Sequence, residues 1–193
     1  VRFELIQVGA RKGKSAVPFE GINVTKDLLD VARNREVDVL VEVIGGTDFA
    51  YELVTEAIKE GKHVVTANKA LLATHGNELF SLAKENKVEI GFEASVAGGV
   101  PIIKVIKESL ISNKISQITG IMNGTSNYLM DEIEKKSIDF DKVLKTAQKL
   151  GYAEKDPTFD IEGIDAAHKL AILSLLVFKK LPKLSGMHIR GVS

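Results

Sequence analysis

A single lysine follows a cluster of acidic residues near the carboxyl end of the sequence, in "GYAEKDPTFDIEGIDAAHKLAIL". Lys169 lies four residues after Asp165, and on a helix Asp165, Lys169, Ile172 and Leu176 share one face. The polar pair therefore continues an apolar stripe. The acidic residues that precede the lysine are Glu154, Asp156, Asp160, Glu162 and Asp165.

Two interpretations of this pair stay open. A solvated i,i+4 ion pair stabilises a helix by only about 0.2–0.5 kcal/mol, and acids favour helix amino ends in any case. In apolar surroundings, however, a lysine loses hydration, which favours the neutral amine and allows proton transfer near neutral pH. Carboxylates beside it would anchor a cationic ligand, and an α-amino acid is the obvious candidate.

Two further stretches offer polar groups to such a pocket. Asn68 and Lys69 follow a predicted strand, where α/β folds bind ligands, although a plain polar turn is the alternative. Asn123 and Thr125 stand before a predicted helix, where capping by Thr125 or Ser126 is the simpler interpretation. His168 has no histidine partner at metal-ligand spacing, so we expect it to pack or to support the site.

The small residues of "GFEASVAGGVP" leave backbone carbonyls approachable. Hard cations prefer oxygen ligands, so this loop is a candidate site for a monovalent cation. An ordinary glycine turn is the alternative.

The stretch "GARKGKS" resembles a phosphate-binding loop but has three residues between its glycines where that motif needs four. The dinucleotide fingerprint Gly-x-Gly-x-x-Gly is missing. Arg11, Lys12 and Lys14 follow a predicted strand with no acid nearby, which favours the 2′-phosphate of NADP over the ribose hydroxyl of NAD. An exposed basic turn explains the same residues.

Strand and helix patterns alternate in the first half, which indicates an α/β fold with a partial, Rossmann-like, doubly wound parallel sheet. Because "DVLVEVIGG" is almost continuously apolar, we expect this strand to be covered on both faces. The predicted strands are 3–8, 38–44, 63–67 and 88–93, and the predicted helices are 26–34, 48–60 and 76–86.

The second half predicts the start of a second, α+β unit. Pro101 suits the first turn of a helix, and "KISQITGIM" alternates as a strand does. Helical patterns then cover 126–136, 139–150 and 162–180. We place the domain boundary between residues 96 and 97, so that 1–96 are the remainder of a nucleotide-binding domain.

Composition excludes several classes of protein. The 193 residues contain 26 basic and 26 acidic side chains, so no net charge attracts nucleic acid. Cysteine is absent, which removes disulfides and thiolate sites and suits a cytoplasmic protein. No stretch reaches the roughly 20 apolar residues that span a bilayer. Both ends look cut, and we read the chain as a fragment of a longer protein.

Several long motifs together resemble homoserine dehydrogenase, in order from about residue 36 onward. They are "EVIGGTDFA", "GKHVVTANKALLA", "FEASVAGGVPIIK", "GIMNGTSNYLMDEIE" and "LGYAEKDPTFDIEGIDAAHKLAIL". The resemblance implies NAD(P)-dependent interconversion of L-homoserine and L-aspartate 4-semialdehyde, on the route to threonine, isoleucine and methionine. It also implies a nucleotide-binding domain joined to a substrate and dimerisation domain, in a homodimer.

The resemblance also implies roles for individual residues. Lys169 matches the proton donor and acceptor. Substrate-binding positions are Glu154, Asp160, Asp165 and Lys69; cofactor-binding positions are Arg11, Lys12, Gly45, Asn68, Lys69 and Gly151; and Glu93, Val96, Gly98 and Val100 match positions that hold a sodium ion. Asn123 and Thr125 belong to a signature near the pocket.

Because the glycine-rich loop and the family's continuation are missing, we expect this chain alone to be weakly active or inactive. One alternative function is a non-catalytic module for amino-acid binding or dimerisation. Another is a related semialdehyde or amino-acid dehydrogenase.

Overall fold

A computed structural model describes residues 2–10 and 21–193. The chain divides into two compact units, Val1–Pro101 and Ile102–Ser193, called here the N-terminal and C-terminal units. The two units meet after Pro101, whereas we placed the domain boundary after residue 96.

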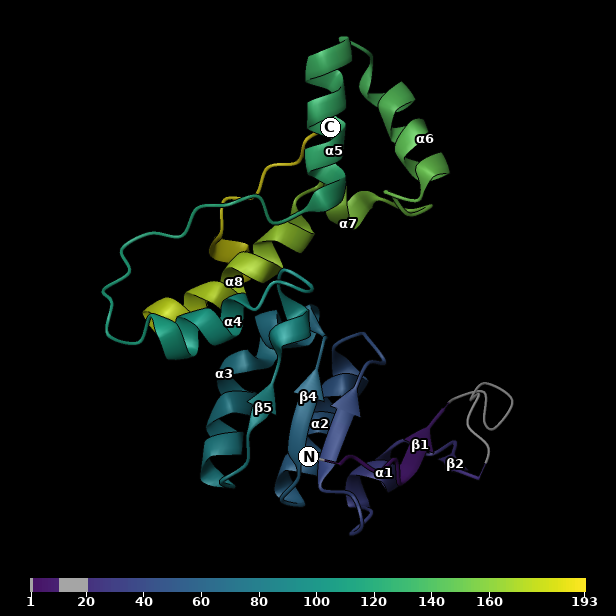
Figure 1. Cartoon of the computed structure of the whole chain (residues 1–193), viewed down its shortest axis with the longest axis vertical. Coiled ribbons are helices and arrows are strands. Elements are labelled where there is room, and N and C mark those ends of the chain that lie inside the picture. Colours follow the sequence, from purple (N-terminus) through teal and green to yellow (C-terminus); the bar gives the residue numbers. More distant parts are fainter. Residues whose placement is uncertain (1, 11–20) are drawn as a thin grey trace. The chain divides into compact units, whose positions relative to one another are not determined.

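Parallel strands organise the N-terminal unit (Figure 1). A three-stranded sheet has the order β3 (Val39–Glu42), β4 (His63–Thr66), β5 (Ile90–Gly91), with Glu42 opposite Thr66. A second, two-stranded sheet pairs β1 (Gln7–Gly9) with β2 (Asn23–Thr25). These parallel sheets confirm the predicted α/β class, while β2 was not predicted.

Three helices accompany these strands: α1 (Leu29–Arg33), α2 (Asp48–Lys59) and α3 (Lys69–Glu85). Helix α2 contacts α1, α3 and the strands β3 and β4. Its inward face buries Leu53, Val54 and Ile58, which remain at most 4% exposed. Burial of this apolar face stabilises the helix on the sheet.

The expectation that the β3 strand is covered on both faces was wrong for the described residues. Leu40 and Glu42 are 3% and 1% exposed, but Val41 between them is 62% exposed. Successive strand residues point to opposite faces, and the contacts with α2 protect only one of them.

Helix α3 begins at Lys69, well before the predicted residue 76. The difference comes from Asn68, whose side-chain oxygen accepts the N–H of Leu71 at 3.1 Å. Such a bond satisfies one of the amide groups that the first helical turn leaves without a partner. In the polar strand-to-helix turn that was one of our two interpretations, Asn68 therefore acts as the helix cap.

Helices dominate the C-terminal unit. After α4 (Ile102–Lys104) and the π-helix η3 (Val105–Ser109), helices α5 (Gly124–Lys136) and α6 (Phe140–Leu150) pack together. Their shared core contains Leu129, Val143, Ala147 and Ala153. The helices predicted over 126–136 and 139–150 are thus confirmed.

Two more helices complete this unit, α7 (Thr158–Ile161) and α8 (Ile164–Phe178). Gly163 separates them in a left-handed conformation, with φ at 76°. The short η4 turn (Leu184–Gly186) follows, and Val192 N–H donates to the carbonyl of Ile161 at 2.8 Å. The end of the chain therefore returns to the α7–α8 corner. Helix α7 was not predicted.

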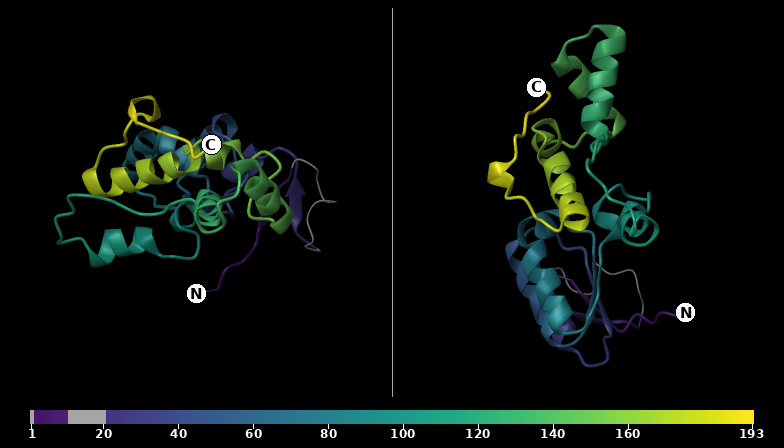
Figure 2. Two further views of the ribbon diagram at one scale, coloured as in Figure 1. Left: turned by 90° about the horizontal axis from the view of Figure 1, so that it is seen from above. Right: turned by 90° about the vertical axis from the view of Figure 1, so that its left-hand side faces the viewer.

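The strand predicted over 114–122 is absent. This segment runs from η3 to α5 without secondary structure, as Figures 1 and 2 show. A strand forms only against another strand, and the described residues of the C-terminal unit contain none. Ile121 is accordingly 79% exposed. The alternation of apolar and polar residues correctly indicated an extended chain, but it did not show that the chain pairs with another strand.

None of the helices in the described part of the chain has the length and apolar character needed to span a bilayer.

Candidate active site

Lys169 and Asp165 form a close, largely buried ion pair on α8. The Nζ atom of Lys169 lies 2.6 Å from Oδ2 of Asp165 and 2.7 Å from the carbonyl oxygen of Met122. The two side chains are 19% and 6% exposed. An exposed i,i+4 pair would leave both groups in water, so the first of our two interpretations does not describe this pair.

Asn123 holds Asp160 and Asp165 together. Its side-chain nitrogen donates to Asp160 at 2.7 Å and to Asp165 at 2.9 Å. Its side-chain oxygen accepts the N–H of Ser126 at 2.7 Å and so caps α5. The expectation that Thr125 or Ser126 provides the cap was wrong, because Asn123 has the extended backbone that a capping residue requires.

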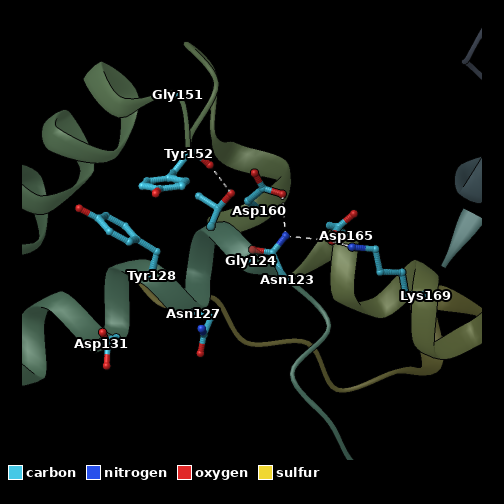
Figure 3. Close-up of a pocket in the computed structure, with 11 residues that line it drawn as sticks. Asn123, Gly124, Asn127, Tyr128, Asp131, Gly151, Tyr152, Asp160, Asp165 and Lys169 are labelled. Carbon is cyan, nitrogen blue, oxygen red and sulfur yellow. Dashed lines mark hydrogen bonds and ion pairs between the residues drawn. The ribbon is translucent and has the colours of Figure 1, made fainter. Parts of the chain in front are cut away.

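These side chains line a cavity of about 640 Å³ in the C-terminal unit (Figure 3). Asn123, Asp160, Asp165 and Lys169 lie at one end, whereas Asp131 and the rings of Tyr128 and Tyr152, 4.8 Å apart, lie at the other. A volume of this size is typical of small-molecule sites. The lining residues are Asn123, Gly124, Thr125, Asn127, Tyr128, Asp131, Gly151, Tyr152, Asp160, Asp165 and Lys169.

A turn between α6 and α7 closes one side of the cavity. Gly151 ends α6 with φ at 79°, a conformation that glycine adopts without strain. The hydroxyl of Thr125 donates to the carbonyl of Tyr152 at 2.7 Å, which ties this turn to the first turn of α5. Thr125 therefore holds the turn that carries Gly151.

Of the predicted catalytic and substrate residues, Lys169, Asp160 and Asp165 meet at this cavity, together with Gly151. Glu154 is exposed and does not line it; the carbonyl of Glu154 accepts from the side chain of Gln148 at 3.1 Å. His168 is buried, with its ring 5.3 Å from that of Phe159. It packs against Phe159, in agreement with the expected packing role.

Asn127, Tyr128 and Asp131 line the cavity but were not predicted as site residues. Their spacing could have identified them, because residues 124, 127, 128 and 131 follow the i, i+3, i+4, i+7 spacing of one helix face. Asn123 was predicted only to lie near the pocket, and its contacts to Asp160 and Asp165 span 37 and 42 residues of sequence. No local pattern encodes contacts of that separation.

The N-terminal unit places Gly45, Asn68 and Lys69 at the carboxyl ends of β3 and β4. Gly45 and Gly46 have φ angles of 73° and 75°, and a side chain at either position would meet no atom within 4 Å. Lys69 is the first residue of α3 and is partly buried. Open glycine turns beside a helix amino end fit the phosphates of a dinucleotide. Arg11, Lys12 and Lys14 lie outside the described residues.

The predicted cation loop is a tight turn in the N-terminal unit. It begins with η2 (Glu93–Ser95), and Ala97 and Gly98 have φ angles of 62° and 56°. Val96 is buried, whereas Val100 is 60% exposed. The described residues contain no group of three His, Cys, Asp or Glu side chains suited to a metal. The cation site of Glu93, Val96, Gly98 and Val100 stays a prediction.

Comparison with known proteins assigns both units to one family. Residues 1–93 match the family described as "Homoserine dehydrogenase, NAD binding domain", and residues 101–193 match "Homoserine dehydrogenase". The chain belongs to the homoserine dehydrogenase family. The resemblance found in the sequence motifs is therefore confirmed.

Individual homoserine dehydrogenases agree with this assignment. That of Pseudomonas aeruginosa is 50% identical over 190 residues, covering 98% of this chain and 44% of that protein. The crystal structure from Thiobacillus denitrificans superposes with a TM-score of 0.90 at 49% identity, covering 97% of this chain and 44% of that one. A hyperthermophilic archaeal homoserine dehydrogenase in complex with NADPH has a TM-score of 0.79 at 32% identity, covering 87% and 52%. This chain thus spans less than half the length of the first two relatives.

Proposed function

We propose that the full-length protein is an NAD(P)-dependent homoserine dehydrogenase that interconverts L-homoserine and L-aspartate 4-semialdehyde, with Lys169 as proton donor and acceptor. The observation that carries this proposal is the position of the Lys169 ammonium, 2.6 Å from Asp165 at the edge of a polar cavity. Membership of the family supports the choice of reaction.

Lys169 would act on the oxygen of the substrate. An ammonium has three N–H donors, and Asp165 and Met122 accept two of them, so a third is available to a substrate oxygen. During reduction Lys169 protonates the alkoxide that forms from the aldehyde. During oxidation its neutral amine removes the hydroxyl proton of homoserine. Such proton transfer contributes about 10²–10⁴-fold to a reaction rate.

The acids would bind the amino group of the substrate. Asp160 and Asp165 both border the cavity, and Asn123 fixes the direction of each carboxylate by a hydrogen bond. A fixed carboxylate orients an ammonium without further loss of side-chain freedom. We also assign Glu154 to substrate binding, which requires its exposed side chain to turn toward the ligand.

A nicotinamide dinucleotide would supply the hydride to the aldehyde carbon. The residues that we assign to its binding are Arg11, Lys12, Gly45, Asn68, Lys69 and Gly151, with Lys69 also reaching the substrate. Basic Arg11 and Lys12 favour NADP over NAD. Carbonyl oxygens of Glu93, Val96, Gly98 and Val100 would hold a sodium ion.

The remaining proposals concern the whole protein. It works as a cytoplasmic homodimer in the synthesis of threonine, methionine and isoleucine, with residues 1–96 in the cofactor domain and 97–193 in the substrate and dimerisation domain. The 193-residue chain alone has little activity, because it spans less than half the length of the relatives named above.

One assay tests the reaction directly. Full-length protein is mixed with L-homoserine and NADP⁺, and absorbance is followed at the reduced-nicotinamide band. We expect an increase with homoserine and little with serine or threonine. A full-length protein that binds homoserine without reducing the cofactor would be a binding module, and preference for another amino acid would indicate a different dehydrogenase.

A further inference from the structure

Glu42 is a buried carboxylate at the end of β3, where the predicted cofactor loops begin. Its side chain is among the largest that the fold buries completely, with the residue 1% exposed. One carboxylate oxygen accepts the N–H of Ile44 at 2.9 Å and that of Gly45 at 3.3 Å. The other accepts the hydroxyl of Thr66 at 2.6 Å. Glu42 thus joins the ends of two neighbouring strands.

The chain of hydrogen bonds continues from Thr66 to Asn68. The Thr66 hydroxyl, while donating to Glu42, accepts the N–H of Asn68 at 2.9 Å. Asn68 then caps α3 through its oxygen and donates its side-chain N–H to the carbonyl of Gly46 at 2.7 Å. Because Gly46 follows Gly45, the bonds form a closed ring. The ring fixes the turn after β3 and the turn after β4 with respect to each other.

Stability alone does not require such a ring. Taking a carboxylate out of water is costly unless hydrogen bonds replace its hydration, and apolar residues of similar volume often stabilise a core as well or better. What a carboxylate adds is direction, since it accepts only and holds each donor along a defined line. Here the donors belong to the backbone of Ile44 and Gly45 and to Thr66, all at the ligand-binding edge of a parallel sheet.

We infer that Glu42 is a positioning residue for the nicotinamide cofactor, acting through Gly45 on one turn and through Thr66 and Asn68 on the other. This inference rests on the proposed function, because it assigns the cofactor to these turns. Glu42 itself is buried, so its effect on the cofactor passes through these neighbours. It sets the shape of the open Gly45–Gly46 turn and the start of α3, at Lys69, before the cofactor arrives.

Thr66 offers the sharpest substitution, because valine has the same shape and lacks the hydroxyl. In the full-length enzyme, Thr66→Val removes the link between Glu42 and Asn68, and Glu42→Gln removes an acceptor at the same place. We expect the dissociation constant for NADPH, measured by nicotinamide fluorescence, to rise about tenfold, because a buried group at these turns loses its hydrogen-bond partner. Thr66→Ser keeps the hydroxyl and should restore the affinity to within about twofold.

Lys62 provides a matched control at the opposite end of β4. It is 4% exposed, and its ammonium donates to the carbonyls of Asn34 at 2.6 Å and Val37 at 2.8 Å. Lys62→Met should therefore lower the melting temperature, as Thr66→Val should, because the carbonyls of Asn34 and Val37 lose their donor. It should leave the NADPH dissociation constant within about twofold of the wild-type value, since a lost buried hydrogen bond acts locally.

The comparison separates the possible outcomes. Weak NADPH binding in Thr66→Val and Glu42→Gln, with normal binding in Thr66→Ser and Lys62→Met, supports the inference. Normal binding in all four variants would reduce Glu42 to a structural residue and overturn it, as would equal weakening in Lys62→Met. Turnover of homoserine by the wild-type enzyme is measured in the same experiment. If the wild-type enzyme does not turn over homoserine, the proposed function is contradicted, whatever the variants show for NADPH binding.

Discussion

Asn123 and Asp165 are joined by a hydrogen bond of 2.9 Å although 42 residues of sequence separate them. Asn123 stands at the start of α5 and Asp165 in the first turn of α8, so this bond fixes two helix ends at one cavity. Asp165 in turn holds Lys169. The position of the ammonium therefore depends on an amide side chain two contacts away.

Substitution of Asn123 should impair catalysis more than folding. Asn123→Asp keeps an oxygen to cap α5 but places a third carboxylate against Asp160 and Asp165, where like charges repel. Asn123→Ser also keeps a cap and loses both bonds to the acids. We expect each variant to lose about 1–3 kcal/mol of unfolding free energy, as buried acceptors lose a donor.

Turnover should fall more in Asn123→Asp than in Asn123→Ser, because only the aspartate repels Asp160 and Asp165. Steady-state assays and thermal unfolding check both, and equal turnover in the two variants would contradict the repulsion.

Thr125→Val should loosen the turn that carries Gly151. The substitution removes the 2.7 Å bond to the carbonyl of Tyr152, while the size of the side chain is kept. We expect the Michaelis constant for homoserine to rise about fivefold, equivalent to about 1 kcal/mol of lost orientation. Thr146→Val is the matched control, because its hydroxyl bonds only within α6, to the carbonyl of Lys142 at 2.9 Å. A similar rise in the control would reject the role of the turn.

Gly163→Ala should destabilise the corner from which α8 begins. Gly163 has φ at 76°, and an added Cβ would lie 3.2 Å from Ile189 and 3.3 Å from the carbonyl oxygen of Arg190. Backbone strain at such a position costs about 1–3 kcal/mol. Gly186→Ala, where a Cβ meets no atom within 4 Å, should change the unfolding free energy little. Chemical denaturation of both variants measures the difference, and equal stability would contradict the strain.

Asp156 should titrate below the usual range of an aspartate. The side-chain hydroxyl of Thr158 donates to it at 2.6 Å and the backbone N–H of Thr158 at 3.2 Å, and these bonds lower its pKa from 3.8. A lowered pKa means that the carboxylate stabilises the loop above the pKa of the unfolded chain and that this contribution is lost as pH falls. Titration by NMR should place the midpoint below 3.8 and move it upward in Thr158→Val. A midpoint unaffected by Thr158→Val would show that the hydroxyl has no such effect.

The sequence predicted best what local periodicity determines. Helix α2 was expected at 48–60 and occurs at Asp48–Lys59, because its apolar spacing and the following Gly61 define both ends. The stripe of α8 likewise identified Lys169 and Asp165 as partners. Four-residue spacing on a helix face is a local property.

What the sequence could not predict depends on distant contacts. The alternating residues 114–122 remain unpaired, since pairing depends on a second strand that the pattern itself does not reveal. Glu42 was read as part of an apolar strand, although its burial depends on Thr66 in the neighbouring strand. Glu154 was assigned to the site by resemblance, and its side chain lies exposed.

The central claim is that Lys169 donates and accepts the proton in the reaction, and replacing Lys169 tests this claim most directly. In the full-length enzyme, Lys169→Ala should lower the rate of homoserine oxidation about 10²–10⁴-fold, with the NADPH dissociation constant little changed. Added methylamine should restore part of this rate, because a free amine can take the proton in place of the missing side chain. A Lys169→Ala enzyme that turns over homoserine at the wild-type rate would contradict the account.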